Sequence, residues 1–185
     1  MLIGIIDSGI GGLEIVKRLN PNNDYIVLMD NAFFPYGNKS KEFLLKRTFY
    51  LVKYLISKSV DKIILGCNTL SITTLSFLRF NFDIPIYGVF EPLIKYFNKK
   101  NIFIGSRLSA KYVREHYHID SISVETLINL LEQDKYYGNF LDKYKNIFIN
   151  YENVILGCTH LLKIPEEEYM VHTINQIEEV KKLVE

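Results

Sequence analysis

Short apolar runs alternate with stretches of helical spacing along the chain. The first run, Leu2–Ile6, stops at a glycine-rich turn, and apolar residues from Leu13 onward then recur at helical spacing. Ser40 precedes a longer stretch of the same spacing and is a predicted helix N-cap. The other predicted strands lie at Tyr25–Met29, Lys62–Leu65, Ile84–Val89, Asn101–Ile104 and Val154–Leu156. Strands separated by helices form parallel sheets covered on both faces, so the pattern predicts an α/β fold.

The turn after the first strand, Asp7–Gly12, is rich in glycine but lacks the spacing of the known nucleotide-binding loops. Glu14 stands where a dinucleotide fingerprint needs its third glycine, and no Gly-Lys-Ser/Thr follows as in a P-loop. The turn still predicts a helix N-terminus with free backbone N–H groups, which suits a carboxylate. Asp7 is then either a helix cap or a group that pairs with a substrate ammonium or tunes a thiol.

One segment of the chain is repeated. Ile64–Thr69 returns in the second half as Ile155–His160, with the same apolar approach and the same Gly-Cys-polar-polar ending. A weaker echo relates Ile3–Ser8 to Asn101–Ser106. We therefore expect two related α/β units, each with one cysteine just beyond the carboxyl end of a strand, where open α/β sheets bind ligands.

The composition excludes several classes of protein. Lys and Arg number 22 and Asp and Glu 21, for a net charge of +1, so no overall field attracts nucleic acid or an anionic membrane. No stretch approaches the roughly 20 apolar residues of a membrane helix, and the N-terminus lacks a signal-peptide pattern. We expect a cytoplasmic protein with neither nucleic acid nor membrane as a partner.

The two cysteines, Cys67 and Cys158, are too few for a disulfide framework and lack the paired spacing of a zinc site. Taken singly, each is typical of a small core residue. Their repeated setting favours a shared role, because two halves packed face to face would place the thiols on opposite sides of one bound molecule. Removing a proton from one face of a carbon and returning one to the other inverts a stereocentre, and a thiolate can act as the base.

Five motifs, in order along the chain, resemble those of the cofactor-independent glutamate racemases of the aspartate/glutamate racemase superfamily. They are residues 3–13, Pro35-Tyr36-Gly37 with Lys39-Ser40, Cys67-Asn68-Thr69, residues 88–92, and Leu156-Gly157-Cys158-Thr159-His160. The resemblance implies two pseudo-symmetric parallel-sheet α/β subdomains with the active site between them. It also implies interconversion of L- and D-glutamate for peptidoglycan, with neither pyridoxal phosphate nor a metal. We expect residues 1–90 with 166–185 to form the first domain and 91–165 a shortened second one.

The resemblance also implies a role for each motif residue. Cys67 and Cys158 would be the two acid/base thiols, and Asp7, Glu132 and His160 would assist proton transfer. The residues expected to hold the substrate are Ser8, Tyr36, Gly37, Asn68, Thr69 and Thr159. Their neutral donors, with the Asp7 carboxylate, form a suitable set for an amino acid.

The chain departs from the family pattern in three places. It is shorter, mainly between Ile104 and Val154, and Leu161-Leu162 replaces the usual Tyr-Pro. The turn Gly105–Ser109 replaces a threonine-rich one, so we expect Arg107 to face or border the cleft. Two alternatives stay open. One is a racemase of the same superfamily that acts on aspartate or another amino acid, and the other is a relative that binds an amino acid but no longer catalyses its racemisation. A homodimer through the aromatic stretch Phe43–Tyr54 also stays open.

Overall fold

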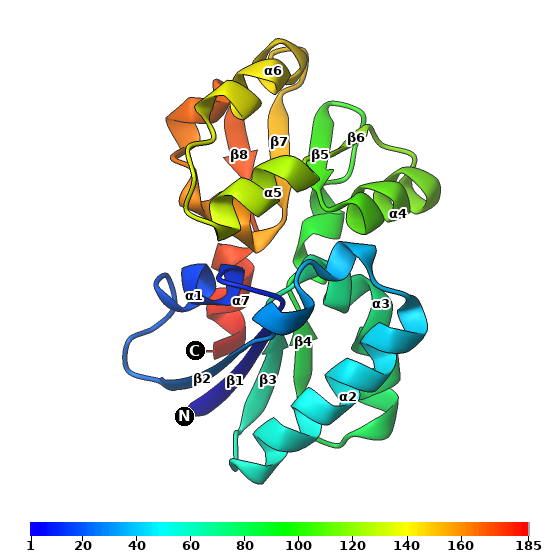
Figure 1. Ribbon diagram of the computed structural model, residues 1–185, viewed down its shortest axis with the longest axis vertical. Helices are drawn as coiled ribbons and strands as arrows, with labels where there is room; N and C mark the ends of the chain where they lie inside the picture. The colour runs from blue at the N-terminus through cyan, green and yellow to red at the C-terminus, as the bar shows by residue number, and fades with distance from the viewer. Residues whose placement is uncertain (185) are drawn as a thin grey trace.

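The computed structural model describes residues 1–184 and shows two four-stranded parallel sheets (Figure 1). The first sheet has the strand order β2-β1-β3-β4 and the second has the order β6-β5-β7-β8. The strands of the first sheet are β1 (Leu2–Asp7), β2 (Asp24–Met29), β3 (Lys62–Leu65) and β4 (Ile86–Gly88). Those of the second are β5 (Asn101–Gly105), β6 (Ser121–Ser123), β7 (Asn153–Gly157) and β8 (His172–Ile174). The α/β fold predicted from the sequence is confirmed.

Helices connect the strands and cover the sheets. The first half carries α1 (Gly11–Val16), α2 (Lys41–Ser57) and α3 (Asn68–Asn81), and the second carries α4 (Arg107–Tyr117), α5 (Glu125–Glu132) and α6 (Gly138–Phe148). The short 3-10 helices are η1 (Asn31–Phe33), η2 (Tyr36–Asn38), η3 (Glu91–Tyr96), η4 (Thr159–Lys163) and η5 (Glu166–Tyr169). The Ser40 hydroxyl accepts a hydrogen bond from the Phe43 N–H at 3.2 Å, which confirms the predicted N-cap of α2.

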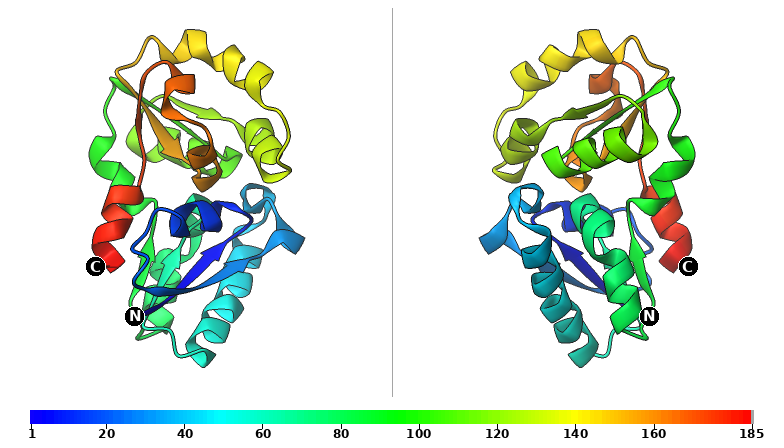
Figure 2. Two further views of the ribbon diagram at one scale, coloured as in Figure 1. Left: turned by 90° about the vertical axis from the view of Figure 1, so that its left-hand side faces the viewer. Right: turned by 90° about the vertical axis from the view of Figure 1, so that its right-hand side faces the viewer.

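The two sheets have equivalent topology. β1 and β5 occupy the same place in their sheets, and so do β3 and β7, which carry the repeated segment. The lobes lie one above the other, with the carboxyl ends of their inner strands facing each other (Figure 2). The predicted repeat therefore corresponds to equivalent strands, and it brings both Gly-Cys turns to the junction.

The C-terminal segment returns from the second lobe to the first. β8 pairs with β7, whereas α7 (Ile177–Val184) lies against the first lobe, where the Lys62 ammonium donates to the Leu183 carbonyl at 2.5 Å. The division into residues 1–90 with 166–185 and residues 91–165 stays a prediction; the strand pairing places His172–Ile174 in the second sheet.

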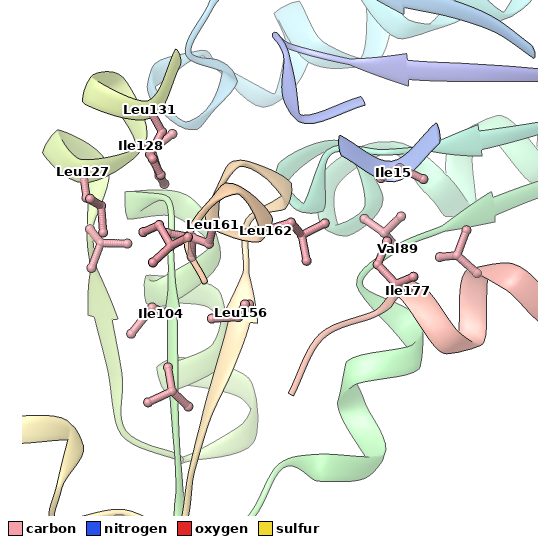
Figure 3. Close-up of a cluster of buried hydrophobic side chains, with 14 of the residues drawn as sticks. Ile15, Val89, Ile104, Leu127, Ile128, Leu131, Leu156, Leu161, Leu162 and Ile177 are labelled. Atoms are coloured by element: carbon pink, nitrogen blue, oxygen red, sulfur yellow. The ribbon is translucent and has the colours of Figure 1, made fainter. Parts of the chain in front are cut away.

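One buried cluster of side chains runs through both lobes. It joins Ile15 of α1 to Leu161 and Leu162 of η4 and to Ile128 of α5 (Figure 3). Shared burial of this kind favours a defined arrangement of the lobes, because separating them would expose apolar surface to water. No helix within residues 1–184 is both long enough and apolar enough to cross a membrane.

Candidate active site

A pocket lies between the two lobes, at the carboxyl ends of the inner strands, where parallel sheets bind ligands. Its empty space is about 340 Å³, a volume that includes the open mouth. Of the predicted site residues, it is lined by Asp7, Ser8, Tyr36, Gly37, Cys67, Asn68, Thr69, Cys158, Thr159 and His160. Glu132 stands behind the lining, against His160. The fold thus gathers in one place residues that are far apart in the sequence.

Cys67 follows β3 and is the N-cap residue of α3. Its thiol is buried, and the backbone N–H groups of Leu70 and Thr69 are directed at it. Burial raises the pKa of Cys67 to about 12, the Asp7 carboxylate adds to the rise, and the two N–H groups oppose it. The thiol of Cys67 is therefore protonated at neutral pH in the unliganded site.

Cys158 follows β7 and is the N-cap residue of η4. Its Sγ atom lies 3.5 Å from Nδ1 of the buried His160, and Nε2 of His160 lies 2.6 Å from Oε2 of Glu132. Burial opposes a charge on His160, but a Cys158 thiolate and the Glu132 carboxylate together raise its pKa to about 10. The three side chains form a line in which an imidazolium would stabilise a thiolate.

Glu132 also connects the two lobes. Its Oε2 atom accepts a hydrogen bond from the Ile10 N–H at 2.9 Å, just before α1. Burial works against the charge of Glu132, but the hydrogen bonds from His160 and Ile10 outweigh it and lower the pKa of the carboxyl. The sequence indicated N–H groups here that suit a carboxylate, and in the structure one of them, that of Ile10, is taken by the chain's own Glu132.

Asp7 lies at the end of β1, fully buried between the two cysteine turns. Oδ1 accepts from the Gly9 N–H at 3.1 Å, and Oδ2 accepts from the Thr159 hydroxyl at 3.0 Å. Burial raises the pKa of Asp7, although the charge of His160 and these donors oppose the rise. The carboxyl is thus tied to the second lobe through Thr159.

Two helix N-termini meet at another wall of the pocket. The Thr69 hydroxyl in the first turn of α3 lies 3.0 Å from the hydroxyl of Ser106, the N-cap residue of α4. Both polar atoms of the Asn68 side-chain amide are buried without a hydrogen-bond partner. A buried amide with two unmade hydrogen bonds is costly, so a polar ligand in the pocket would satisfy it.

Tyr36 is oriented from behind the pocket. Its hydroxyl donates to Asp30, which Arg47 of α2 holds with two hydrogen bonds, of 2.8 and 2.6 Å. Burial, together with the Asp30 carboxylate, raises the pKa of the Tyr36 phenol, so the phenol stays protonated.

Comparison with known proteins gives a consistent result, although no family model matches the chain. A glutamate racemase of Buchnera aphidicola is 34% identical, with 97% of this chain and 80% of the relative covered. Another from Clostridium botulinum is 36% identical over 91% of this chain and 74% of the relative. The chain belongs to the glutamate racemase family. The crystal structure of the family member from Campylobacter jejuni superposes with a TM-score of 0.81 at 25% identity, covering 100% of this chain and 84% of that one.

Likeness to aspartate racemases extends to the fold alone. The enzyme of Picrophilus torridus has a TM-score of 0.69 at 16% identity, with 99% of this chain and 92% of that chain covered. What the two proteins share is the two-lobed α/β architecture.

Several residues that line the pocket of this chain were not predicted as site residues. They are Phe34, Pro35, Ser106, Ser109, Ile128 and Gly157. Two signals were available for Ser106: it lies in the weak sequence echo of Ser8, and it belongs to the turn Gly105–Ser109 that replaces a threonine-rich one. Phe34 and Ile128 face the pocket only because the lobes pack together, so no local pattern marks them.

The side chain of Arg107 borders the pocket and does not face it. Its side chain is 76% exposed, lies 3.5 Å from Glu125 and is not part of the pocket lining. Ser106, the N-cap residue of α4, lines the pocket, whereas the side chain of Arg107 pairs with Glu125. Within residues 1–184, the pocket lining contains neither Lys nor Arg, and no group of three His, Cys, Asp or Glu side chains is arranged to hold a metal ion.

Proposed function

We propose that this chain interconverts L- and D-glutamate with two thiols on opposite sides of the substrate, one of which removes the α-proton while the other supplies a proton to the opposite face. The observation that carries the proposal is that the repeated Gly-Cys turns of the two lobes line one pocket, in a member of the glutamate racemase family. One thiolate takes the proton from the α-carbon, and the electron pair moves into the adjacent carboxylate group. The opposite thiol then delivers its proton to the other face, which leaves the two thiols with exchanged roles.

The surroundings of the two thiols favour different protonation states for Cys67 and Cys158. Cys67 is buried beside Asp7 and carries a pKa of about 12, so it is the proton donor of the resting site. The Sγ atom of Cys158 lies 3.5 Å from Nδ1 of the buried His160, where an imidazolium would stabilise a thiolate. A thiolate paired with an imidazolium is a recognised way to obtain a base at neutral pH. We therefore assign the base of the resting site to Cys158.

The pocket wall supports a dicarboxylate as the substrate. The N-terminal ends of α3 and α4 contribute the hydroxyls of Thr69 and Ser106, and Asn68 offers an unpaired amide. Helix N-termini and neutral donors can hold a carboxylate without a cationic side chain. Asp7 would attract the ammonium group, with Ser8, Tyr36, Gly37 and Thr159 as further substrate contacts.

The proposed product, D-glutamate, would serve as a building block of the cell wall. We propose that the D-glutamate enters peptidoglycan, as the family resemblance implies, and that the protein acts in the cytoplasm, where a cell-wall precursor would be made.

We also propose a homodimer through α2, whose Tyr50 is 66% exposed. Sedimentation of the wild type and of Tyr50→Lys tests the dimer: a wild-type monomer would contradict it.

The deciding experiment measures optical rotation and deuterium uptake with L-glutamate in D₂O, without added cofactor and in the presence of a chelator. We expect D-glutamate carrying deuterium at the α-carbon. Cys67→Ala and Cys158→Ala should each reduce racemisation by about 10²–10⁴-fold, the usual contribution of one acid/base group. Full activity in either variant would refute the two-thiol mechanism, and activity lost to chelator and restored by a metal would refute the cofactor-free reaction. Turnover of aspartate in preference to glutamate would refute the substrate.

A further inference from the structure

The short helix η4 carries two predicted site residues, Thr159 and His160, directly after Cys158. A 3-10 helix is closed by hydrogen bonds from the N–H of each residue to the carbonyl three residues earlier. The residue three positions after Leu162 is Pro165, which has no N–H to give. The Leu162 carbonyl at the end of η4 therefore needs a donor from elsewhere in the fold.

Arg18, two residues after α1, supplies that donor. Its Nη2 atom donates to the Leu162 carbonyl at 2.7 Å. The Nη1 atom donates to the carbonyl and to Oε2 of Glu14, each at 2.8 Å. Three hydrogen bonds thus fix the guanidinium, which bridges the first lobe and the η4 segment of the second.

Glu14 is an unusual partner because its side chain is only 8% exposed. Its other oxygen, Oε1, accepts from the Lys17 ammonium at 2.6 Å. Burial works against the charge of Glu14, but hydrogen bonds from Lys17 and Arg18 outweigh it and lower the pKa of the carboxyl. A buried, ionised carboxylate holds its partner in a narrow range of positions, unlike an ion pair on the surface.

The start of α1 is packed closely against the same segment. A Cβ atom on Gly11 would lie 2.2 Å from the Thr159 hydroxyl and 3.0 Å from Nδ1 of His160, so the helix backbone touches both side chains. Between the two ends, Ile15 belongs to the same buried cluster as Leu162 (Figure 3). η4 is thus held against the first lobe from its beginning to its end.

We propose that Arg18 is a positioning residue for the Cys158 side of the site, where it holds the Leu162 carbonyl and thereby fixes His160 beside Cys158. The proposal rests on the proposed function, since it gives Arg18 a part in that reaction. Arg18 contacts neither thiol and acts only through η4. Cys67, the N-cap residue of α3, meets η4 only indirectly, through the Asp7 carboxylate that accepts from Thr159, so removing the guanidinium should affect Cys158 more than Cys67.

The test compares Arg18→Met, which keeps an apolar stem, with Arg18→Lys and Glu14→Gln. Arg114→Met is a matched control, because the Arg114 guanidinium also donates to a backbone carbonyl, that of Ser121, away from the pocket. The measurements are kcat and KM for glutamate and the pH dependence of iodoacetamide alkylation at each cysteine, resolved by mass spectrometry. The pH dependence of Cys158 alkylation is sensitive to the position of His160, whose Nδ1 lies 3.5 Å from Sγ. The other titratable groups that act on this pair are Asp7, Glu132, Cys67 and Tyr169, and none of the variants alters them.

For Arg18→Met we expect kcat to fall roughly 10- to 100-fold, as for a displaced catalytic group, with a larger change in the alkylation profile at Cys158 than at Cys67. Arg18→Lys should restore part of the loss, and Arg114→Met should keep wild-type kcat. Unchanged kcat in Arg18→Met, or equal changes at both thiols, would overturn the proposal. If Arg18→Met does not fold, the same criteria apply to Arg18→Lys and Glu14→Gln. Alkylation needs no turnover. If the wild type itself fails to racemise glutamate while Arg18→Met still changes Cys158 selectively, the proposed function is refuted and the positioning role stands.

Discussion

Oε2 of Glu132 accepts hydrogen bonds from both Nε2 of His160, at 2.6 Å, and the backbone N–H of Ile10, at 2.9 Å. One oxygen atom therefore orients the imidazole beside Cys158 and ties the second lobe to the glycine-rich turn of the first. Any change that moves this carboxylate should affect the chemistry of His160 before it affects folding.

Glu132→Gln should reduce kcat by about 10²-fold, the low end of the contribution of one acid/base group. The amide oxygen can still accept one hydrogen bond, but the negative charge that helps to raise the pKa of His160 to about 10 is lost. Because a carboxylate stabilises the imidazolium, its removal lowers this pKa, and the imidazole loses its proton at a lower pH. The alkaline limb of the kcat/KM profile should move to lower pH, and an unmoved limb would contradict the coupling.

Gly9→Ala should impair activity more than stability. A Cβ atom there would lie 2.3 Å from Oε2 of Glu132, which would force that carboxylate away from His160. Gly138→Ala is the control, since its Cβ would meet the hydroxyl of Tyr136, an exposed side chain that can rotate away. Gly138 is the first residue of α6, where alanine is no worse a helix former than glycine, so Gly138→Ala should keep its activity and should not lower the melting temperature. A wild-type kcat in Gly9→Ala would contradict the prediction, because it would show that Glu132 can avoid the added Cβ atom and still hold His160.

The sequence was sufficient for features with local signals. The apolar runs identify the inner strands, and the Gly-Cys repeat locates both thiols, because each signal lies within a few consecutive residues. The bond between Ile10 and Glu132 joins residues 122 apart, and it depends on how the lobes pack, which no local pattern records. The unpaired amide of Asn68 and the network behind Tyr36 likewise become visible only when the surrounding side chains are in place.

Asp30→Asn should make the protein less stable at neutral pH and remove part of its acid sensitivity. Burial works against the charge of Asp30, but hydrogen bonds from Arg47 and Tyr36 outweigh it and lower its pKa from the ordinary 3.8. A carboxyl with a lowered folded-state pKa stabilises the fold above its ordinary pKa, and this stabilisation is lost as the pH falls through the folded-state value. We expect a loss of about 1–3 kcal/mol at pH 7, typical of hydrogen bonds to a charged group. Urea unfolding of both proteins between pH 2 and pH 7, about the range that spans both pKa values, should show the difference narrowing in acid; a constant difference would contradict the assignment.

Substrate preference should depend on Ser106 and not on its neighbour Arg107. The Ser106 hydroxyl lies 3.0 Å from that of Thr69 in the pocket, whereas the Arg107 side chain is directed at Glu125 and is 76% exposed. Ser106→Ala removes a donor from the wall proposed to hold a carboxylate, so kcat/KM for glutamate should fall about 10-fold or more, as expected for a hydrogen bond to a charged group.

Arg107→Ala should leave the ratio of kcat/KM between glutamate and aspartate within about twofold of the wild-type ratio, because the two diacids differ by one methylene and the exposed guanidinium contacts neither end of the pocket. The measurement is kcat/KM for both diacids and for one neutral amino acid in each variant. Ser106→Ala should lose more activity toward the diacids than toward the neutral substrate, since only the diacids place a second carboxylate against the pocket wall. A changed ratio of kcat/KM between the diacids in Arg107→Ala would mean that the guanidinium reaches the substrate during turnover. If Ser106→Ala were at the same time indistinguishable from wild type, the hydroxyls of Ser106 and Thr69 would not select the substrate.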